Sequence, residues 1–220
     1  MPTIFTDRRA GSSLTPYESL NLALHVGDNV DAVLKNRASL EINCGAIQFM
    51  NQVHGDSFVV VDQIRDVDPT CDALITTTPG LAVAVMIADC IPLLLSSTKV
   101  VAAVHVGRKG LTNSIAIKTI EEMLRLGSTS IHAQLGPSIC GQCYEVPQAM
   151  ADEVLITHPS AFAVTRNATP SLDLPRALIA DLVAHGVTYE ASTICTLENP
   201  EYFSYRRCNI TGRSAGVIWL

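Results

Sequence analysis

The sequence lacks a segment that could serve as a signal peptide or cross a membrane. Residues 1–9 (MPTIFTDRR) contain no apolar core and no cleavage pattern. The longest apolar run, from Leu81 to Leu95, is interrupted by Asp89 and Pro92 and is too short to span a bilayer. From these absences we expect a cytoplasmic protein that has no membrane partner.

Charged residues are also scarce, at 16% of the 220 residues, whereas hydrophobic residues make up 48%. This balance excludes a disordered chain. We find no internal repeat, low-complexity tract or linker, so we expect one domain spanning residues 1–220. The 21 acidic residues outnumber the 15 basic ones and give a net charge of −6, which argues against a nucleic-acid partner.

The seven cysteines are odd in number and irregularly spaced, unlike a disulfide framework. In the cytosol they would be thiols, some of which could be metal ligands or nucleophiles. Cys140 and Cys143 form a Cys-x-x-Cys pair, but no second pair completes a zinc site and no thioredoxin-like context surrounds it. We interpret this pair as part of a loop near the functional site.

Hydrophobic periodicity predicts a mixture of strands and helices. The strands come in runs between helices rather than in strict alternation, which favours a layered α+β fold. Residues 81–88 are apolar on both faces, as expected for a strand covered on two sides. The expected helices are 30–43, 112–126, 147–157 and 173–185, with Asn29, Thr112 or Asn113, and Asp173 as candidate caps. The expected strands are 47–53, 58–62, 72–76, 81–88, 92–96, 100–106, 131–135 and 215–220.

Three residues at the ends of apolar strands are the candidate catalytic and metal-binding residues: His54, Cys90 and His105. Side chains that leave neighbouring strands at one edge can converge on a single cleft. Two imidazoles and a thiolate match the ligand preferences of zinc or copper, and three protein ligands leave a fourth position open. The same residues permit two other interpretations. Cys90 could be a nucleophile with His105 as its base, or the three could be ordinary buried side chains.

A series of short motifs runs in order through nearly the whole chain. They are Ser19–Leu22 with His25–Asp28, Asn36–Arg37, Gln52–Gly55, Asp72–Leu74, Ala88–Pro92, His105–Gly107, Gly136–Pro137 with Tyr144–Val146, Glu198–Asn199, Phe203–Arg207 and Thr211–Arg213. Together they resemble the YfiH-like proteins, also called the polyphenol oxidase or laccase-domain family and regarded as multifunctional purine nucleoside phosphorylases. The metal and catalytic triad of that family corresponds to His54, Cys90 and His105.

The resemblance implies a four-layer α/β/β/α sandwich with mixed sheets, shared with the catalytic domain of the cytotoxic necrotizing factor deamidases. It implies a transferase that splits adenosine, inosine and 5′-methylthioadenosine with inorganic phosphate. It also implies adenosine deamination, a hydrolase reaction. The expected cofactor is Zn²⁺, with Cu²⁺ as the alternative. The expected partners are a purine nucleoside and phosphate, and the expected assembly is a monomer or homodimer.

The candidate substrate-binding residues are Asn21 and Gln52, which lie in motifs, and Lys109 and Arg206, which belong to short basic groups in an otherwise acidic chain. Such groups indicate a local site for phosphate. The chain departs from the family at two places. Lys109 stands where the family has arginine, after loss of a tryptophan, and Cys208 stands where an acidic residue is usual.

Two other enzymes and one non-enzymatic role remain open from the sequence. The first enzyme is a copper-dependent polyphenol oxidase, although six histidines with no His-x-His pair argue against a trinuclear copper cluster. The second is a metal-free cysteine hydrolase that uses Cys90 and His105. A metal-binding partner of another protein would turn over no substrate.

Overall fold

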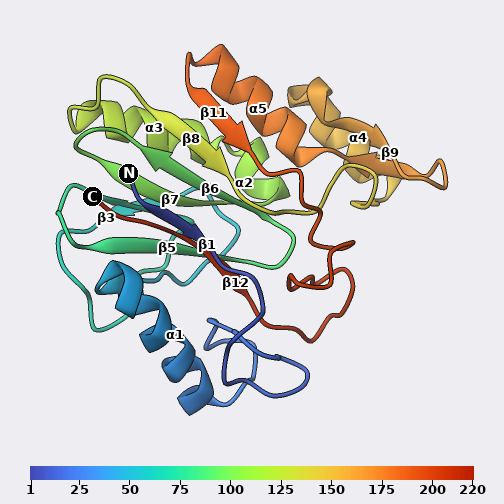
Figure 1. The fold of residues 1–220 in the computed structure, drawn as a ribbon. Coiled ribbons are helices and arrows are strands. Elements are labelled where there is room, and N and C mark those ends of the chain that lie inside the picture. Colours follow the sequence, from blue (N-terminus) through green and yellow to red (C-terminus); the bar gives the residue numbers. More distant parts are fainter.

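The computed structural model describes residues 1–220 and shows two stacked β-sheets between two layers of helices (Figure 1). The first sheet has the order β1-β12-β5-β2, and the second has the order β11-β8-β6-β7-β4-β3. The first contains β1 (Thr3–Phe5), β12 (Ser214–Ile218), β5 (Ala82–Ile87) and β2 (Ile47–Gln48). The second contains β11 (Thr188–Ala191), β8 (His132–Leu135), β6 (Ile91–Ser96), β7 (Val101–Val106), β4 (Ala73–Thr76) and β3 (Phe58–Val60).

Helices cover the outer face of each sheet. Helix α1 (Val30–Cys44) packs on the four-stranded sheet through Leu40 and Cys44. The six-stranded sheet shares a hydrophobic cluster with the other helices, α2 (Arg108–Thr112), α3 (Ile115–Arg125), α4 (Gln148–Thr157) and α5 (Leu174–Ala184). A short helix, η1 (Pro159–Ala161), leads into a hairpin of β9 (Phe162–Val164) and β10 (Pro170–Leu172). The α+β class expected from the sequence pattern and the α/β/β/α layering implied by the resemblance are confirmed.

Strand β5 shows why its sequence is apolar on both faces. Its alternate residues Val83, Val85 and Ile87 belong to the cluster between the two sheets. Ala82, Ala84 and Met86 point the other way, into the cluster beneath α1. Because successive side chains of a strand point to opposite faces, a strand inside this sandwich must be apolar at every position.

Two helix caps agree with the sequence prediction. The Asn29 side chain accepts a hydrogen bond from the Ala32 amide at 3.0 Å, and Asp173 accepts one from the Arg176 amide at 3.0 Å. The helix expected over 112–126 begins later, as α3 at Ile115, and it is preceded by the separate helix α2, which was not expected. Asn113 and Ser114 separate the two helices, and the φ of 61° at Ser114 interrupts helical geometry, so Ser114 and neither Thr112 nor Asn113 is the residue directly before α3.

The strand expected over 47–53 is much shorter than predicted. Only Ile47 and Gln48 pair with β5. Beyond them the Gln52 side chain, and not the backbone, hydrogen-bonds to β5. Gln52 Nε2 donates to the Met86 carbonyl and Gln52 Oε1 accepts from the Met86 amide, both at 2.8 Å. The backbone of residues 49–53 is thereby free to leave the sheet and form the loop that carries His54.

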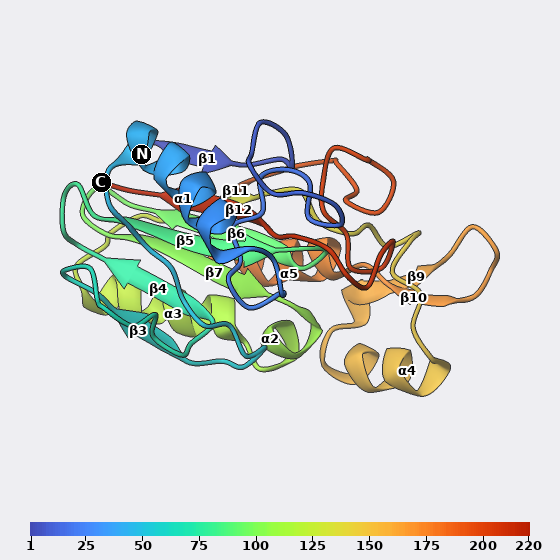
Figure 2. The same ribbon diagram turned by 90° about the horizontal axis from the view of Figure 1, so that it is seen from below.

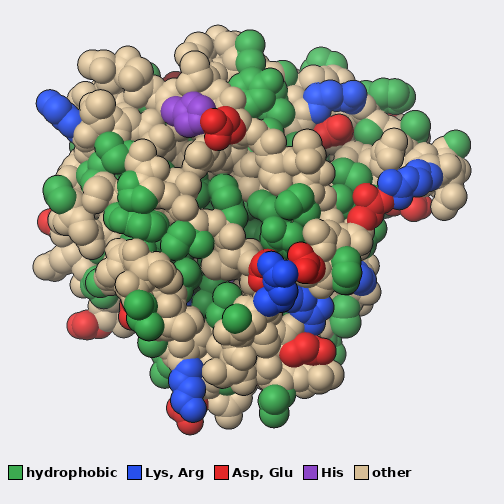
Figure 3. All heavy atoms as spheres, viewed as in Figure 1, with side chains coloured by type: hydrophobic (Ala, Val, Ile, Leu, Met, Phe, Trp, Pro, Cys, Tyr) green, Lys and Arg blue, Asp and Glu red, His purple; other side chains and the backbone are tan.

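The two chain ends lie side by side, because β1 pairs with β12 and Thr3 aligns with Ile218 (Figure 2). On the face seen in Figure 3, most Lys and Arg side chains lie next to Asp or Glu rather than in one basic patch. Ion pairs such as Arg9 with Glu201 illustrate this mixing. None of the helices combines the length and the hydrophobicity that a membrane crossing requires.

Candidate metal centre and its cavity

Asp72, directly before β4, organises the loop that carries His54. Its buried carboxylate accepts hydrogen bonds from three successive backbone amides, those of Val53 (3.3 Å), His54 (2.9 Å) and Gly55 (2.7 Å). His54 has a φ of 58°, in the left-handed region that residues other than glycine seldom adopt. The three hydrogen bonds from backbone amides to the Asp72 carboxylate stabilise this backbone conformation and fix the position of the His54 imidazole.

The same carboxylate also orients His105 in β7. Strands β4 and β7 are antiparallel with Ala73 opposite Val104, and the His105 amide donates to the Asp72 carbonyl at 2.8 Å. In addition, Asp72 Oδ1 lies 2.8 Å from His105 Nδ1. Burial alone would raise the pKa of Asp72, but hydrogen bonds from His105 and the Gly55 amide lower it below its usual range. The ionised carboxylate therefore holds the proton on Nδ1 and leaves Nε2 available to another partner.

Cys90 lies where the chain crosses from one sheet to the other. Residues 88–90 connect β5 of the four-stranded sheet to β6 of the six-stranded sheet. Asp89 has a φ of 93°, and its carboxylate accepts hydrogen bonds from the Thr196 hydroxyl and the Arg206 amide, both at 2.8 Å. These two hydrogen bonds stabilise the connection between the sheets, so the position of Cys90 depends on the loop of residues 192–213 as well as on the sheets.

The structure brings His54, Cys90 and His105 together. One ligand atom from each lies within 4.8 Å of the others, and Cys90 Sγ is 4.0 Å from His54 Nε2. The two imidazole rings meet edge to face, with centroids 4.7 Å apart. His105 is buried, Cys90 is half-buried and His54 is exposed, so the group opens toward solvent on one side.

These three residues fit a metal ion. They offer two imidazoles and one thiolate, which suit zinc or copper, and they leave a further coordination position for water or substrate. The Asp72–His105 hydrogen bond is the second contact that metal-binding histidines commonly make through their other ring nitrogen. His54, Cys90 and His105 are therefore the residues that would hold the ion.

The thiol and the imidazole also influence each other's protonation. Burial alone would raise the pKa of Cys90, but the charged His105 ring and hydrogen bonds from both histidines lower it. Burial alone would lower the pKa of His105, but Cys90 and Asp72 raise it. Without a metal, the buried pair thus favours a thiolate beside an imidazolium, the state that a nucleophilic cysteine requires.

Gly107 provides the space in which the three side chains meet. A Cβ added there would lie 3.1 Å from Cys90 Sγ and 3.3 Å from His54 Cδ2. The backbone of Gly107 has φ −88° and ψ −178°, a conformation open to any residue. Glycine is therefore needed at this position for room and not for backbone freedom.

We expect Gly107→Ala to fold normally but to bind zinc about tenfold more weakly, because the added methyl group displaces Cys90 and His54 from each other. Competitive titration with a zinc-binding dye measures the affinity, and circular dichroism checks the fold. Unchanged zinc affinity in a folded variant would show that the two side chains do not share an ion.

A cavity of about 590 Å³ opens beside these three residues. Its wall has four basic side chains, Arg108, Lys109, Arg206 and Arg213, and two tyrosines, Tyr144 and Tyr205. Arg206 lies over the Tyr144 ring, with its guanidinium carbon 4.7 Å from the ring centroid. A cavity that combines cations with aromatic faces suits a ligand that has both an anionic part and a flat ring.

The basic side chains differ in how far they are already bonded within the protein. Arg108 and Lys109 make no side-chain hydrogen bond or ion pair. Arg206 Nη1 donates to the Glu145 carbonyl at 2.7 Å, and Arg213 Nη1 donates to two carbonyls of its own loop. Since a guanidinium carries five N–H donors, both arginines retain donors for a ligand.

Three of the four predicted substrate-binding residues, Gln52, Lys109 and Arg206, line the cavity. Gln52 is engaged with the Met86 backbone, as described above. Asn21 is elsewhere: it is fully buried, and its side chain bonds Asp28 and accepts from the Arg213 amide at 2.9 Å. This placement supports a role for Asn21 in holding the Arg213 loop and gives no support to a substrate contact.

Sequence reasoning missed several residues of the site. Asp72 was identified only as part of a motif, because its four partners become neighbours through the register of β4 and β7 and the fold of the 53–55 loop. Arg108 and Arg213 belong to the short basic groups that indicated a phosphate site, but neither was selected from them, and for Tyr144 and Tyr205 motif membership was the only available signal.

Comparison with known proteins identifies the family. Residues 2–220 match the family model described as multi-copper polyphenol oxidoreductase laccase. The chain belongs to this family. The family expected from the motifs is thus confirmed, and the match includes both sheets and all the residues of the cavity.

Relatives in this family carry a different functional name. A protein of Corynebacterium glutamicum named purine nucleoside phosphorylase is 43% identical over 99% of this chain and 93% of its own length. Another of the same name from Streptomyces coelicolor is 44% identical over 98% of this chain and 94% of its own length. Among solved structures, the Neisseria meningitidis protein NMB0706 matches with a TM-score of 0.90 and 35% identity, covering 99% of this chain and 93% of that chain. The Bacillus licheniformis protein YfiH matches with a TM-score of 0.88 and 29% identity, covering 98% and 91%.

The family description refers to copper, so the placement of the other potential copper ligands matters. His132 bonds the Thr188 hydroxyl, and both His158 and His185 contact Asp181. The fourth remaining histidine, His25, lines the cavity, and like the other three it belongs to no cluster of donors. The sulfur of Met86 lies 4.0 Å from the Arg37 guanidinium, and Met86 packs in the cluster beneath α1. The donors that meet in one place beside the cavity are those of His54, Cys90 and His105.

Proposed function

We propose that this protein is a metal-dependent purine nucleoside phosphorylase that acts on adenosine, inosine and 5′-methylthioadenosine, with adenosine deamination as a side activity. The observation that carries the proposal is the cavity itself. It places free cationic donors and two tyrosine rings beside a His-Cys-His donor set. Close relatives named purine nucleoside phosphorylase support the same reaction.

The basic residues of the cavity would bind the attacking phosphate. Arg108 and Lys109 have no competing partner in the protein, and Arg206, which lines the cavity, keeps N–H groups that are not bonded within the protein. In an acidic chain, these charges offset the repulsion that an incoming dianion would meet. In phosphorolysis a phosphate oxygen bonds to C1′ of the ribose while the bond from C1′ to the base breaks, and the base retains the electron pair. Holding phosphate close to C1′ converts this encounter into an intramolecular step.

The tyrosines would bind the base. Tyr205 is half exposed at the cavity and Tyr144 is covered by Arg206, so Tyr205 offers the more accessible face for stacking. Stacking on an aromatic side chain tolerates changes in the base, which suits an enzyme that accepts both adenosine and inosine.

His54, Cys90 and His105 would hold zinc, the first choice for this donor set, with copper as the alternative. When bound, zinc supplies Lewis acidity and a nucleophilic water at neutral pH, which is the chemistry that deamination of adenine at C6 requires. Asp72 keeps His105 in the tautomer that presents Nε2, and the 53–55 loop keeps His54 at the cavity.

The decisive experiment is product analysis with and without inorganic phosphate. Purified protein reconstituted with zinc should release free base and ribose 1-phosphate from adenosine or inosine only when phosphate is present. Equal base release in phosphate-free buffer would identify a nucleoside hydrolase. Formation of inosine from adenosine without base release would leave only the deaminase activity.

Arg206→Ala should raise the KM for phosphate by about tenfold or more while changing the KM for the nucleoside much less, because a charge-assisted hydrogen bond to the anion is lost. Arg206→Lys is the matched control, since it retains the charge but not the paired donors. Initial rates over a grid of both substrates separate the two constants. A change confined to the KM for the nucleoside would place the phosphate elsewhere in the cavity.

Lys109→Arg should leave the KM for phosphate unchanged or lower it slightly, because it restores the arginine that is usual in the family at this position.

A second candidate function has its own observation. Cys90, His105 and Asp72 form a chain in which the carboxylate bonds one ring nitrogen and the thiol is close to the ring. This is the arrangement of a metal-free cysteine hydrolase, with the thiolate as nucleophile and the imidazolium as acid. Phenol oxidation by a copper-loaded form remains the third candidate, for which the family description is the support.

A further inference from the structure

A second cluster of donors lies where two loops leave the parallel strands β8 and β11. Thr188 pairs with His132 at the start of these strands, and Ala191 pairs with Leu135 at their end. The pairing resumes beyond the strands, because Ser138 bridges Cys195, and the Thr196 amide donates to the Ser138 carbonyl at 3.1 Å. Since the carboxyl ends of parallel strands meet at one edge, residues about 55 apart in sequence become neighbours there.

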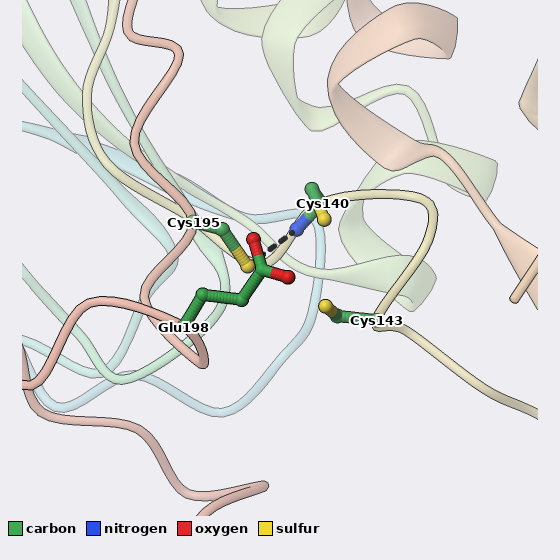
Figure 4. Close-up of side chains that lie close together, drawn as sticks. All are labelled: Cys140, Cys143, Cys195 and Glu198. Atoms are coloured by element: carbon green, nitrogen blue, oxygen red, sulfur yellow. Dashed lines mark hydrogen bonds between the residues drawn. The ribbon is translucent and has the colours of Figure 1, made fainter. Parts of the chain in front are cut away.

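Four side chains from these loops point toward one another, Cys140 and Cys143 from the first and Cys195 and Glu198 from the second (Figure 4). Their three sulfurs and a carboxylate oxygen all lie within 4.8 Å of one another. Cys195 is buried, Cys140 and Cys143 are half-buried, and Glu198 is exposed. Cys140 and Cys143 lie close together in the sequence as a Cys-x-x-Cys pair, and the fold brings Cys195 and Glu198 to them.

The sulfurs have few other partners. The Cys140 amide donates to Cys195 Sγ at 3.4 Å, in addition to the backbone hydrogen bonds between the two loops. Glu198 pairs with Arg166 through one carboxylate oxygen, which leaves its second oxygen free.

We propose that Cys140, Cys143, Cys195 and Glu198 form a second, structural metal site that binds zinc. Thiolate-rich sets of four protein ligands are typical of structural zinc, because they complete its tetrahedral coordination and exclude water. Sulfurs bound at about 2.3 Å from zinc lie about 3.8 Å apart, so ligand atoms already within 4.8 Å need only small inward movements. On binding, each thiol releases its proton to solvent, and Arg166 offsets part of the negative charge.

This site would fix the wall of the cavity without taking part in the reaction. Tyr144 follows Cys143 directly and lies beneath Arg206. Thr196 follows Cys195 directly, and its hydroxyl bonds Asp89 next to Cys90. An ion bound to both loops would therefore hold Tyr144 in position, together with the hydrogen bond between Thr196 and Asp89. The inference does not depend on which reaction the protein catalyses.

Metal content of the full-length protein tests the proposal. After saturation with zinc and removal of excess metal, we expect about two zinc ions per chain in the unaltered protein and about one in Cys143→Ser. Cys90→Ser should also retain about one, and the double variant about none. Cys208→Ser is the control, because Cys208 is an exposed cysteine whose sulfur bonds only the Ile210 carbonyl.

Cobalt distinguishes the two sites by their ligands. Sulfur-to-cobalt absorption should be strong in Cys90→Ser, which retains the three-sulfur site, and weak in Cys143→Ser. Glu198→Ala, a change at a side chain 40% exposed, should weaken zinc binding at the second site without unfolding the protein. Arg166→Ala removes the same ion pair but no ligand and should keep both ions.

Two results would overturn the proposal. One is a zinc-saturated protein with at most one ion per chain, whose content is unchanged by Cys143→Ser and Glu198→Ala. The other is a Cys140–Cys143 or Cys140–Cys195 disulfide in peptide maps of protein purified without reductant, together with a single zinc. In either case phosphate-dependent turnover could still be observed, so failure of this proposal and failure of the proposed function are separate outcomes.

Discussion

Replacing Cys90 by serine is expected to lower nucleoside turnover, and the zinc affinity of the site formed by His54, Cys90 and His105, by more than about 100-fold each. Loss of a hydrogen-bond partner of a metal ligand typically costs about 10–100-fold, and here the ligand itself is lost. Cys90 is the only anionic donor among the three candidate ligands, and a serine hydroxyl stays protonated at neutral pH. Zinc titration and steady-state rates measured on the same preparation give the two effects.

The outcome at Cys90 also decides between the candidate mechanisms. If Cys90→Ser retains full metal affinity but loses all activity, the cysteine is a nucleophile and the metal is not held by its sulfur. Addition of an alkylating reagent gives an independent result, because zinc bound at Cys90 should protect this thiol from modification. Cys208→Ser should behave like the unaltered protein in each assay, since Cys208 is exposed and lies outside the donor cluster.

Asp72→Asn is expected to reduce turnover and zinc affinity by about 10–100-fold, although Asp72 does not touch the metal position. The buried carboxylate accepts from His105 Nδ1 and from three backbone amides. An amide of the same shape replaces one acceptor oxygen by a donor, so at least one of these hydrogen bonds becomes a clash of donors. We also expect the free energy of unfolding to fall by about 1–3 kcal/mol, because a buried donor loses its partner.

Two measurements test the positioning role of Asp72. Nuclear magnetic resonance of the His105 ring should show a mixture of tautomers in Asp72→Asn, which a purely structural effect would not produce. Asp68→Asn is the control, because Asp68 is a partly exposed carboxylate that pairs with Arg37 and not with His105. A variant of Asp72 with normal zinc affinity and a normal His105 spectrum would contradict the role.

The sequence predicted those elements whose side chains are buried in a regular pattern. Strands β5, β6 and β7 and helices α1 and α5 were found because apolar periodicity and capping residues specify them. Strand β11 was missed because all four of its residues are exposed and carry no such pattern. Strand β1 was missed because it has three residues and gains its stability from pairing with β12, at the other end of the chain.

The same distinction applies to the candidate site. His54, Cys90 and His105 could be singled out because each follows or ends an apolar strand. The partners that hold them could not, because the contacts of Asp72 and Asp89 arise from strand register and from a loop that begins about 100 residues later. Cys195 illustrates the limit most clearly. No spacing rule connects it to Cys140 and Cys143, and only the parallel pairing of β8 with β11 does.

The short crossing at residues 88–90 has a consequence for cooperativity. It joins β5 of one sheet to β6 of the other, so Cys90 is tied to both, while His105 belongs to the six-stranded sheet and the His54 loop follows β2 of the four-stranded sheet. Separating the two sheets would pull these residues apart. An ion bound among them would therefore be released only by an opening that exposes the core between the sheets, and its binding free energy would add to the global stability. Backbone amides at the centre of β5 should then exchange with deuterium more slowly when zinc is bound, although no residue of β5 is a ligand.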